Sequence, residues 1–145
     1  MTASPTIRLE FGSAFDMLDF VQVVSDYVGR LTGLDEDQLY EVSVAVREVV
    51  VNAIKHGNKH DLAKRVVVEF SVEPSDHMTV WVKDQGPGFD PEEIPDPLAP
   101  ENIMKGSGRG ILFMRNYMDD VSLSRHPEGG MQIWMKKRRA VPPAS

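Results

Sequence analysis

Glu48 and Asn52 are two polar residues whose types and spacing could support chemistry on phosphates. They lie four residues apart in a stretch with helical periodicity, so both side chains should project from one helix face. The Asn52 carbonyl oxygen suits a hard cation such as Mg²⁺, and the Glu48 carboxylate one turn away could orient or deprotonate a hydroxyl group. On spacing alone, the pair is also compatible with two ordinary solvated helix residues.

Asp84 is a second candidate, because it ends a stretch in which Val80 and Val82 alternate with polar residues. It shares the parity of these valines, so its carboxylate should point toward the core. A buried carboxylate needs a partner. The exocyclic amine of a bound base is one possibility, since Gly86 and Gly88 would let the backbone approach a ring closely. The backbone N–H groups of a tight turn are the other.

A glycine-rich run opens a helical stretch later in the chain and is the third candidate. Its residues are Gly106, Ser107, Gly108, Arg109 and Gly110. Free N–H groups and the positive dipole at a helix N-terminus bind phosphate, and the Arg109 guanidinium would add a forked cation. The run lacks the Lys of a Walker loop and follows no strand of a Rossmann unit, so it favours neither of those nucleotide folds. A plain flexible hinge is the alternative.

The elements that must position these residues follow from the periodicity of the apolar residues. A capping box of Asp35 and Gln38 predicts the start of one long helix, and Gly57 is expected to end it in the left-handed conformation. The expected strands span 6–11, 66–72, 78–82, 120–125 and 130–137, the expected helices span 17–31, 35–57 and 107–119, and an irregular segment at 85–110 is expected to be a binding loop. This order predicts an α+β fold, a two-layer sandwich of a mixed, mainly antiparallel sheet with helices on one face.

Length and composition limit the classes of protein. The 145 residues predict a single domain, with a core at about 6–137 and a tail at 138–145. No cysteine is present, no run is apolar enough for a membrane span, and the four histidines are scattered, so we expect a cytoplasmic protein without a zinc site. The formal charge of −6 disfavours duplex nucleic acid as a partner. The basic run 136–139 is expected to be a solvated edge.

Taken together, the three candidates resemble the N, G1 and G2 boxes of the GHKL (Bergerat-fold) ATPase superfamily. The matching segments are Glu48-x-x-x-Asn52-Ala with His56-Gly57 behind it, Asp84-x-Gly86-x-Gly88-Phe89, and Gly106-x-Gly108-x-Gly110. Within that superfamily the chain is most similar to the anti-sigma-factor serine/threonine kinases of bacteria. Met118-Asp119-Asp120-Val121 is also typical of that group. The resemblance covers about residues 6–137.

The resemblance implies a role for each matching residue. Asn52 would bind Mg²⁺, and Glu48 would be the general base. Arg109 would stabilise the phosphate charge during phosphoryl transfer. The remaining nucleotide-binding residues would be Asp84, Gly86, Gly88 and Phe89 at the adenine and Gly106, Ser107, Gly108 and Gly110 near the phosphates, with 89–110 as the ATP lid. Four prolines within this lid, at positions 91, 95, 97 and 100, should make it stiffer than a glycine-rich one.

The resemblance also implies ATP-dependent phosphorylation of an anti-anti-sigma partner, sequestration of a sigma factor, and a homodimer. The first helix and the opening strand are the candidate dimer face, because they carry apolar residues with no other role. A module that sequesters a partner in response to ATP without kinase activity is the main alternative. A detached histidine kinase domain is a third, but the two opening helices hold no histidine before His56 to accept a phosphoryl group.

Overall fold

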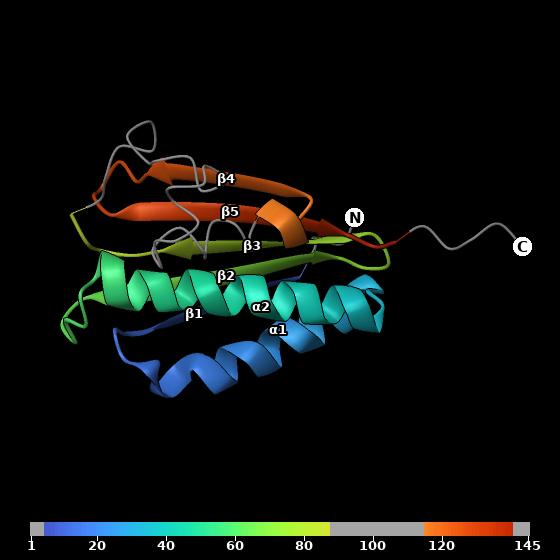
Figure 1. The fold of residues 1–145 in the computed structure, drawn as a ribbon, viewed down its shortest axis with the longest axis horizontal. Coiled ribbons are helices and arrows are strands. Elements are labelled where there is room, and N and C mark those ends of the chain that lie inside the picture. The colour runs from blue at the N-terminus through green and yellow to red at the C-terminus, as the bar shows by residue number, and fades with distance from the viewer. Residues whose placement is uncertain (1–4, 88–114, 141–145) are drawn as a thin grey trace, which may run out of the picture.

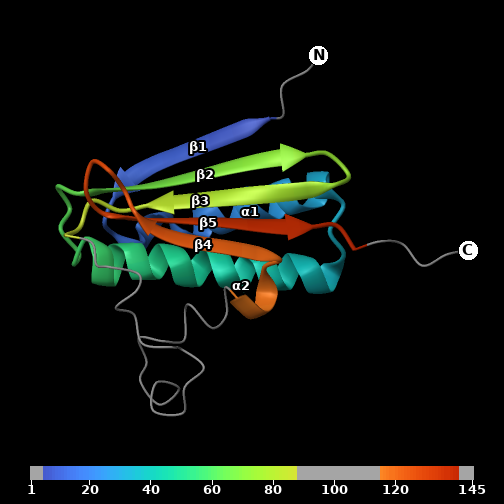
Figure 2. The ribbon, with the colours of Figure 1, turned by 90° about the horizontal axis from the view of Figure 1, so that it is seen from above.

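The computed structural model describes residues 5–87 and 115–140, which form a sheet covered by helices. The elements are β1 (Thr6–Gly12), η1 (Phe15–Met17), α1 (Leu18–Thr32), α2 (Glu36–Asn52), η2 (Ala53–Gly57), β2 (Arg65–Glu73), β3 (His77–Lys83), β4 (Asp120–Arg125) and β5 (Met131–Arg138). The strands lie in the order β1-β2-β3-β5-β4. Helices α1 and α2 lie side by side on one face of this sheet (Figures 1 and 2).

The predicted fold class is confirmed. The α+β sandwich has its helices on one face, and the sheet is mainly antiparallel as expected. All four strand pairings within the described ranges are antiparallel, so that part of the sheet contains no parallel pair to make it mixed. The five predicted strands are each found within a residue or two of the expected ends. Of the third expected helix, residues 115–119 lie in the described part; 115–117 are helical, and 118 and 119 are not.

Local sequence signals explain how α1 and α2 begin and end. Gly33 ends α1 with a φ of 86°, a left-handed conformation that costs glycine little. The capping box that starts α2 is present: Asp35 Oδ1 accepts from the Gln38 N–H at 2.8 Å, and Gln38 Oε1 accepts from the Asp35 N–H at 3.3 Å. Leu34 and Leu39 on either side are both buried and staple the chain to the helix.

The core lies between the helices and one face of the sheet. Val68 on β2 pairs with Val82 on β3, and Phe70 pairs with Val80, all four being at most 1% exposed. On the opposite face Trp81 pairs with Trp134 of β5. This separation of apolar and mixed faces is the period-2 pattern that predicts the hairpin, so the sheet and the helices meet through a continuous apolar layer.

The β2–β3 hairpin turns at residues 74–76, where Ser75 adopts a φ of 61°. His77 Nδ1 donates to Asp76 Oδ2 at 2.5 Å, and this hydrogen bond lowers the pKa of Asp76. The turn lies at the opposite end of β3 from Asp84. In the described part of the chain, neither α1 nor α2 is long and apolar enough to cross a bilayer.

Two expectations about particular residues are wrong. Gly57 does not adopt the left-handed conformation; α2 runs on into the π-helical turn η2, and Asn58 closes it with a φ of −86°. The basic run 136–139 is not wholly solvated either, because Lys137 is only 6% exposed. Lys137 follows Met135 by two residues and therefore shares its core-facing side of β5.

Candidate functional site

Asp84 is buried immediately after β3, as its parity with Val80 and Val82 predicts. Its Oδ1 atom accepts from the backbone N–H of Gly86 at 2.9 Å and from that of Met131 at 3.1 Å. The backbone N–H groups of a turn, one of the two expected kinds of partner, thus hold one carboxylate oxygen. In the described parts of the chain no hydrogen bond reaches Oδ2, so this oxygen can accept one from a ligand.

Three glycines let the backbone pack directly around Asp84. A Cβ atom on Gly57 would lie 2.2 Å from Asp84 Oδ2, one on Gly86 would lie 1.9 Å from the Gly57 carbonyl oxygen, and one on Gly130 would lie 2.1 Å from the Asp84 carbonyl oxygen. Position 57 therefore requires glycine because its backbone lies so close to Asp84, and not because its φ is positive. The end of η2, the loop after β3 and the turn before β5 converge on this carboxylate.

Asn58 is a buried residue that links these converging segments by hydrogen bonds, a role that the sequence does not predict. Its side chain is 1% exposed. Nδ2 donates to Ser13 Oγ at 2.8 Å and to the Arg65 carbonyl at 3.0 Å, while Oδ1 accepts from the Gln85 N–H at 2.7 Å. A buried amide with three partners holds the loop after β3 against the end of η2. The only signal in the sequence is an Asn directly after His56-Gly57, within a segment that shows no period.

Glu48 and Asn52 lie on α2, and both side chains are half-buried. Asn52 is the last residue of α2, directly before the π-helical turn whose last residue contacts Asp84. Glu48 lies one turn earlier on the same face. Within the described ranges neither side chain forms a hydrogen bond or an ion pair, so both keep their oxygens available. The structure thus brings the N-box residues and Asp84 to the same end of the molecule. π-helical turns of this kind often occur at functional sites.

The other predicted site residues lie outside the described ranges. They are Gly88, Phe89, Gly106, Ser107, Gly108, Arg109 and Gly110. In the described part no cluster of three or more His, Asp or Glu side chains could hold a metal ion by itself. His56 and His60 are exposed, in agreement with the prediction that they are surface residues.

The fold and the residues around Asp84 agree with the comparison to known protein families. A family model described as a histidine kinase-like ATPase domain matches residues 17–137. The chain therefore belongs to the histidine kinase-like ATPase family, and its resemblance to GHKL ATPases is confirmed.

Among curated proteins the chain is similar to proteins named anti-sigma F factor. That of Bacillus subtilis (strain 168) is 34% identical over 137 residues, which cover 90% of each chain. That of Clostridium perfringens (strain 13 / Type A) is 34% identical over 137 residues, 91% of this chain and 95% of its own. That of Geobacillus stearothermophilus is 33% identical over 140 residues, 90% of each chain. The similarity to these anti-sigma F factors thus extends over almost the whole length of this chain and of each relative.

Proposed function

We propose that this chain is an anti-sigma factor with ATP-dependent serine/threonine kinase activity, which phosphorylates an anti-anti-sigma partner and sequesters a sigma factor. The observation that carries the proposal is the position of Asp84, a buried carboxylate whose Oδ1 is held by two N–H groups while its Oδ2 accepts no hydrogen bond from the described parts of the chain. The relatives named anti-sigma F factor support the regulatory role. Because a sigma factor acts on RNA polymerase, we infer that the protein works in the cytoplasm.

The nucleotide would be held at its two ends by different parts of the chain. Asp84 Oδ2 accepts a hydrogen bond from the exocyclic amine of adenine, and the close packing of Gly86 on the Gly57 carbonyl holds the loop after β3 in place beside this carboxylate. Gly88 and Phe89 complete the adenine pocket. Gly106, Ser107, Gly108 and Gly110 bind the phosphates through their N–H groups, and Arg109 stabilises the charge.

The residues around Asn52 fit a magnesium ion bound together with ATP. Asn52 offers a half-buried amide oxygen that makes no hydrogen bond within the described ranges, and one protein oxygen is enough for an ion that keeps waters and phosphate ligands. When bound, Mg²⁺ would neutralise phosphate charge. Asn52 is its proposed protein ligand.

Glu48 is the proposed general base. The oxygen of a Ser or Thr hydroxyl on the partner attacks the γ-phosphorus, the bond from that phosphorus to the ADP oxygen breaks, and the hydroxyl proton passes to the Glu48 carboxylate. ADP leaves with the bonding electron pair. Phosphoryl transfer of this kind needs chiefly positioning and electrostatic stabilisation, so a small domain can supply it.

Replacing Glu48 by Gln tests the kinase proposal. The change keeps the shape of the side chain and removes its basicity, so transfer of the γ-phosphoryl group from ATP to a cognate anti-anti-sigma protein should fall at least about 100-fold. Nucleotide affinity should stay within about twofold. Glu36→Gln, at the exposed start of α2, is the control.

Phosphoserine or phosphothreonine on the partner is measured by mass spectrometry over time. Undiminished transfer by Glu48→Gln would exclude Glu48 as the base. If the wild-type protein captures its partner in an ATP-dependent way and yields no phosphorylated product, the protein is a sequestration module without kinase activity.

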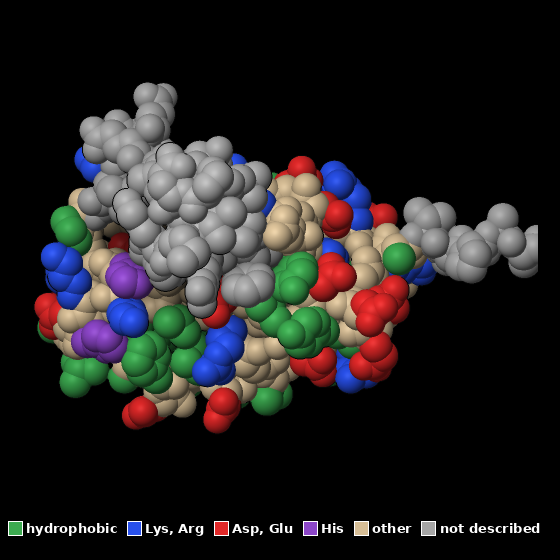
Figure 3. Space-filling view, viewed as in Figure 1, with side chains coloured by type: hydrophobic (Ala, Val, Ile, Leu, Met, Phe, Trp, Pro, Cys, Tyr) green, Lys and Arg blue, Asp and Glu red, His purple; other side chains and the backbone are tan. Residues whose placement is uncertain are grey.

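We further propose that the protein is a homodimer that uses α1. Four large side chains of this helix form an exposed stripe: Phe20, Val23, Tyr27 and Leu31, which are 50%, 66%, 60% and 40% exposed. Hydrophobic side chains are visible on the surface over α1 and α2 in Figure 3. Strand β1 is an edge strand of the five described strands, so a second copy that covers α1 could also pair with this edge.

Tyr27→Glu should therefore convert a dimer into a monomer, because it places a charge in the centre of an apolar stripe. Tyr40→Glu is a matched control, since Tyr40 is equally exposed, at 65%, but lies on α2. Sedimentation equilibrium measures the mass of each. A wild-type monomer, or a dimer that survives Tyr27→Glu and dissociates in Tyr40→Glu, would contradict this interface.

A further inference from the structure

The segment 55–65, which leads from η2 into β2, is basic and exposed. It holds four cationic side chains and one acidic side chain, in a chain whose formal charge is −6. Lys55, Lys59 and Arg65 are exposed, and Lys64 is half-buried. Leu62 in the same segment is 68% exposed. The segment therefore combines positive charge with an exposed apolar side chain.

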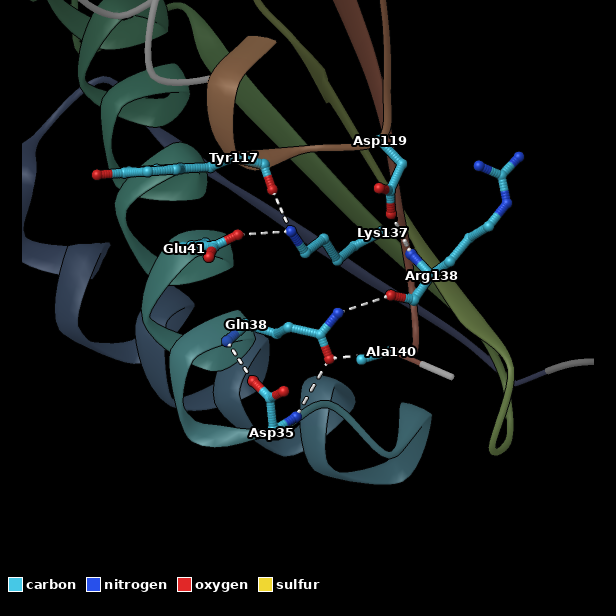
Figure 4. Close-up of polar contacts among 8 residues, drawn as sticks. All are labelled: Asp35, Gln38, Glu41, Tyr117, Asp119, Lys137, Arg138 and Ala140. Atoms are coloured by element: carbon cyan, nitrogen blue, oxygen red, sulfur yellow. Dashed lines mark hydrogen bonds and ion pairs between the residues drawn. The ribbon is translucent and has the colours of Figure 1, made fainter. Parts of the chain in front are cut away.

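The cations of this segment have no acidic partner in the described part of the chain. No hydrogen bond or ion pair there involves the side-chain nitrogens of its three lysines or its arginine. In the other basic run, Lys137 Nζ donates to Glu41 Oε2 at 2.7 Å and to the backbone carbonyl of Tyr117 (Figure 4). Arg138 beside it pairs with Asp120 at 3.2 Å. The second run is thus partly neutralised within the chain, whereas segment 55–65 keeps its positive charge available to an acidic molecule.

The backbone of this segment is held in a defined shape. Lys59 and His60 adopt left-handed φ angles of 52° and 59°, which residues other than glycine rarely take. The Asn58 N–H donates to the Ala53 carbonyl and the His60 N–H donates to the Ile54 carbonyl, each at 2.8 Å. Strained residues persist where such contacts hold them, and they often occur at binding surfaces. Because the segment is already ordered, a molecule that binds it pays little entropy to fix its backbone.

The segment also lies directly against the loop that carries Asp84. Asn58 Oδ1 accepts from the Gln85 N–H at 2.7 Å, and Gln85 Oε1 accepts from the Arg65 N–H at 2.5 Å. Gly57, the residue before Asn58, contacts the Asp84 carboxylate. Segment 55–65 therefore borders the candidate site through hydrogen bonds at both of its ends.

Phe15 adds a second exposed apolar side chain to this surface. It is 43% exposed, and its ring meets the His60 ring edge-on, with the ring centroids 5.1 Å apart. Ser13 Oγ donates to the Lys64 carbonyl at 2.8 Å and holds the chain before η1 against the segment. Figure 3 shows histidine, cationic and hydrophobic side chains together at the end of the molecule where α2 ends. We call the exposed side chains of residues 55–65 and Phe15 the basic loop surface.

We propose that the basic loop surface docks the protein that receives the phosphoryl group, and that the docking face of this protein is acidic and carries an apolar side chain. The inference rests on the proposed function, which brings a Ser or Thr hydroxyl of the partner to Glu48. Glu48, Asn52 and Asp84 lie at the end of the molecule that this surface borders, so a partner whose hydroxyl reaches Glu48 comes close to it. Opposite charge steers the partner and fixes its orientation. Leu62 and Phe15 give its apolar side chain a contact.

An acidic protein fits the basic loop surface better than two other occupants. A second copy of this chain would bring the same cations against one another, and like charges facing each other disfavour association. A nucleic acid would place phosphates on the cations, but the formal charge of −6 on the whole chain repels a phosphate backbone. Exposed leucine and phenylalanine side chains also match a protein surface and not a charged backbone.

The double variant Lys59→Glu, Lys64→Glu tests the proposal. Neither side chain makes a hydrogen bond in the described ranges, so the variant should fold, which circular dichroism checks. Steady-state kinetics of phosphoryl transfer measure the KM for a cognate anti-anti-sigma protein and the KM for ATP. We expect the KM for the partner to rise at least tenfold, while kcat and the KM for ATP stay within twofold of the wild type. Lys136→Glu, on the open face of β5, is the control and should change none of these values.

Two further measurements keep the test valid if the double variant does not fold. Leu62→Ser removes an exposed apolar side chain and should raise the KM for the partner at least threefold, again without a change in the KM for ATP. Salt screens exposed charges, so the wild-type KM for the partner should rise with NaCl concentration while the KM for ATP changes less. A KM for the partner that neither Leu62→Ser nor salt changes would overturn the inference.

Several results of the main test would also overturn it. They are an unchanged KM for the partner in the folded double variant, or equal rises in the two KM values, which would indicate a defect in the nucleotide site. A dimer that dissociates in the double variant, measured by sedimentation equilibrium, would assign the surface to a second copy. Binding of a DNA oligonucleotide that the double variant loses, with the KM for the partner unchanged, would assign it to nucleic acid.

Failure of the proposed function gives a different result. A wild-type protein that transfers no phosphoryl group to the partner would refute the kinase proposal, and titration calorimetry of the same partner would then test docking alone. Binding by the double variant that is at least tenfold weaker than by the wild type would support the basic loop surface. Equal binding by both proteins, or no binding by the wild type, would overturn it.

Discussion

The two carboxylate oxygens of Asp84 have different tasks, and replacing one of these oxygens by a nitrogen would separate them. Oδ1 accepts from two backbone N–H groups, at 2.9 and 3.1 Å, and thereby orients the side chain. Oδ2 lies against Gly57 and is the oxygen proposed to meet a base. An asparagine at this position can keep the first task, because its carbonyl oxygen still accepts, and must fail at the second, because its NH₂ group donates.

Asp84→Asn should therefore weaken ATP binding at least about tenfold, a loss of about 1.4 kcal/mol or more, with a smaller effect on folding. An amide donor would face the donor amine of adenine across the pocket. Titration calorimetry measures the affinity and urea unfolding measures the stability. Asp76→Asn, an exposed carboxylate at the far end of β3, serves as the control. Unchanged ATP affinity in Asp84→Asn would show that Asp84 does not recognise the base.

Single residues differ in how far their roles can be predicted from the sequence. The burial of Asp84 follows from strand parity alone, because two apolar neighbours at i−2 and i−4 set its face. The roles of Asn58 and Lys137 depend on partners 27 and 96 positions away, Gln85 and Glu41. A lysine in a run of four basic residues predicts a solvated edge, and only the helix packed over β5 reveals that this one is enclosed.

At the scale of elements, the contact between η2 and the loop after β3 determines the shape of the site. α2 ends at Asn52, and a π-helical turn continues the chain to Gly57, the predicted end of the helix. This turn places Gly57 against Asp84 and the Gly57 carbonyl against Gly86. Periodicity and capping signals predict where elements begin because those signals are local. The way in which this helix ends depends on packing against a distant loop. The sequence therefore predicts the position of Gly57 at the helix end, whereas its cause, close approach to Asp84 and not a positive φ, appears only in the structure.

Gly57→Ala should destabilise this contact, because the added Cβ would lie 2.2 Å from Oδ2 of an Asp84 carboxylate that two backbone N–H groups hold in place. Overpacking of this kind costs about 1–3 kcal/mol, and ATP binding should weaken together with stability. Gly12→Ala is the control, since its Cβ would meet only the Leu62 carbonyl oxygen, at 3.2 Å. Urea unfolding at equilibrium measures the free energy of unfolding of each alanine variant. Equal stability of the two alanine variants would mean that the backbone around residue 57 yields more easily than the geometry implies.

At the scale of the whole molecule, one end of the sandwich concentrates the polar groups proposed to act on ATP. Asn52 at the end of α2, Asp84 at the end of β3 and Gly130 before β5 belong to segments that the sheet order β1-β2-β3-β5-β4 brings together. The opposite end holds the β2–β3 turn and the start of α2. A ligand that binds at the first end ties the helix layer to the sheet layer, and its binding free energy adds to the stability of the native state.

ATP with Mg²⁺ at 100 times its dissociation constant should therefore stabilise the protein by about 2.7 kcal/mol and raise the melting temperature by roughly 5–10 °C, given about 2–4 °C per kcal/mol for a domain of this size. GTP should give a much smaller shift, because its ring carries a carbonyl oxygen where adenine carries the amine, and that oxygen would face the Asp84 carboxylate. Differential scanning calorimetry at matched nucleotide concentrations measures both shifts. Asp84→Asn should lose most of the ATP shift. Equal shifts with ATP and GTP would show that the phosphates supply the affinity and that Asp84 does not select the base, whereas no shift with either nucleotide would contradict a nucleotide site at this end of the sandwich.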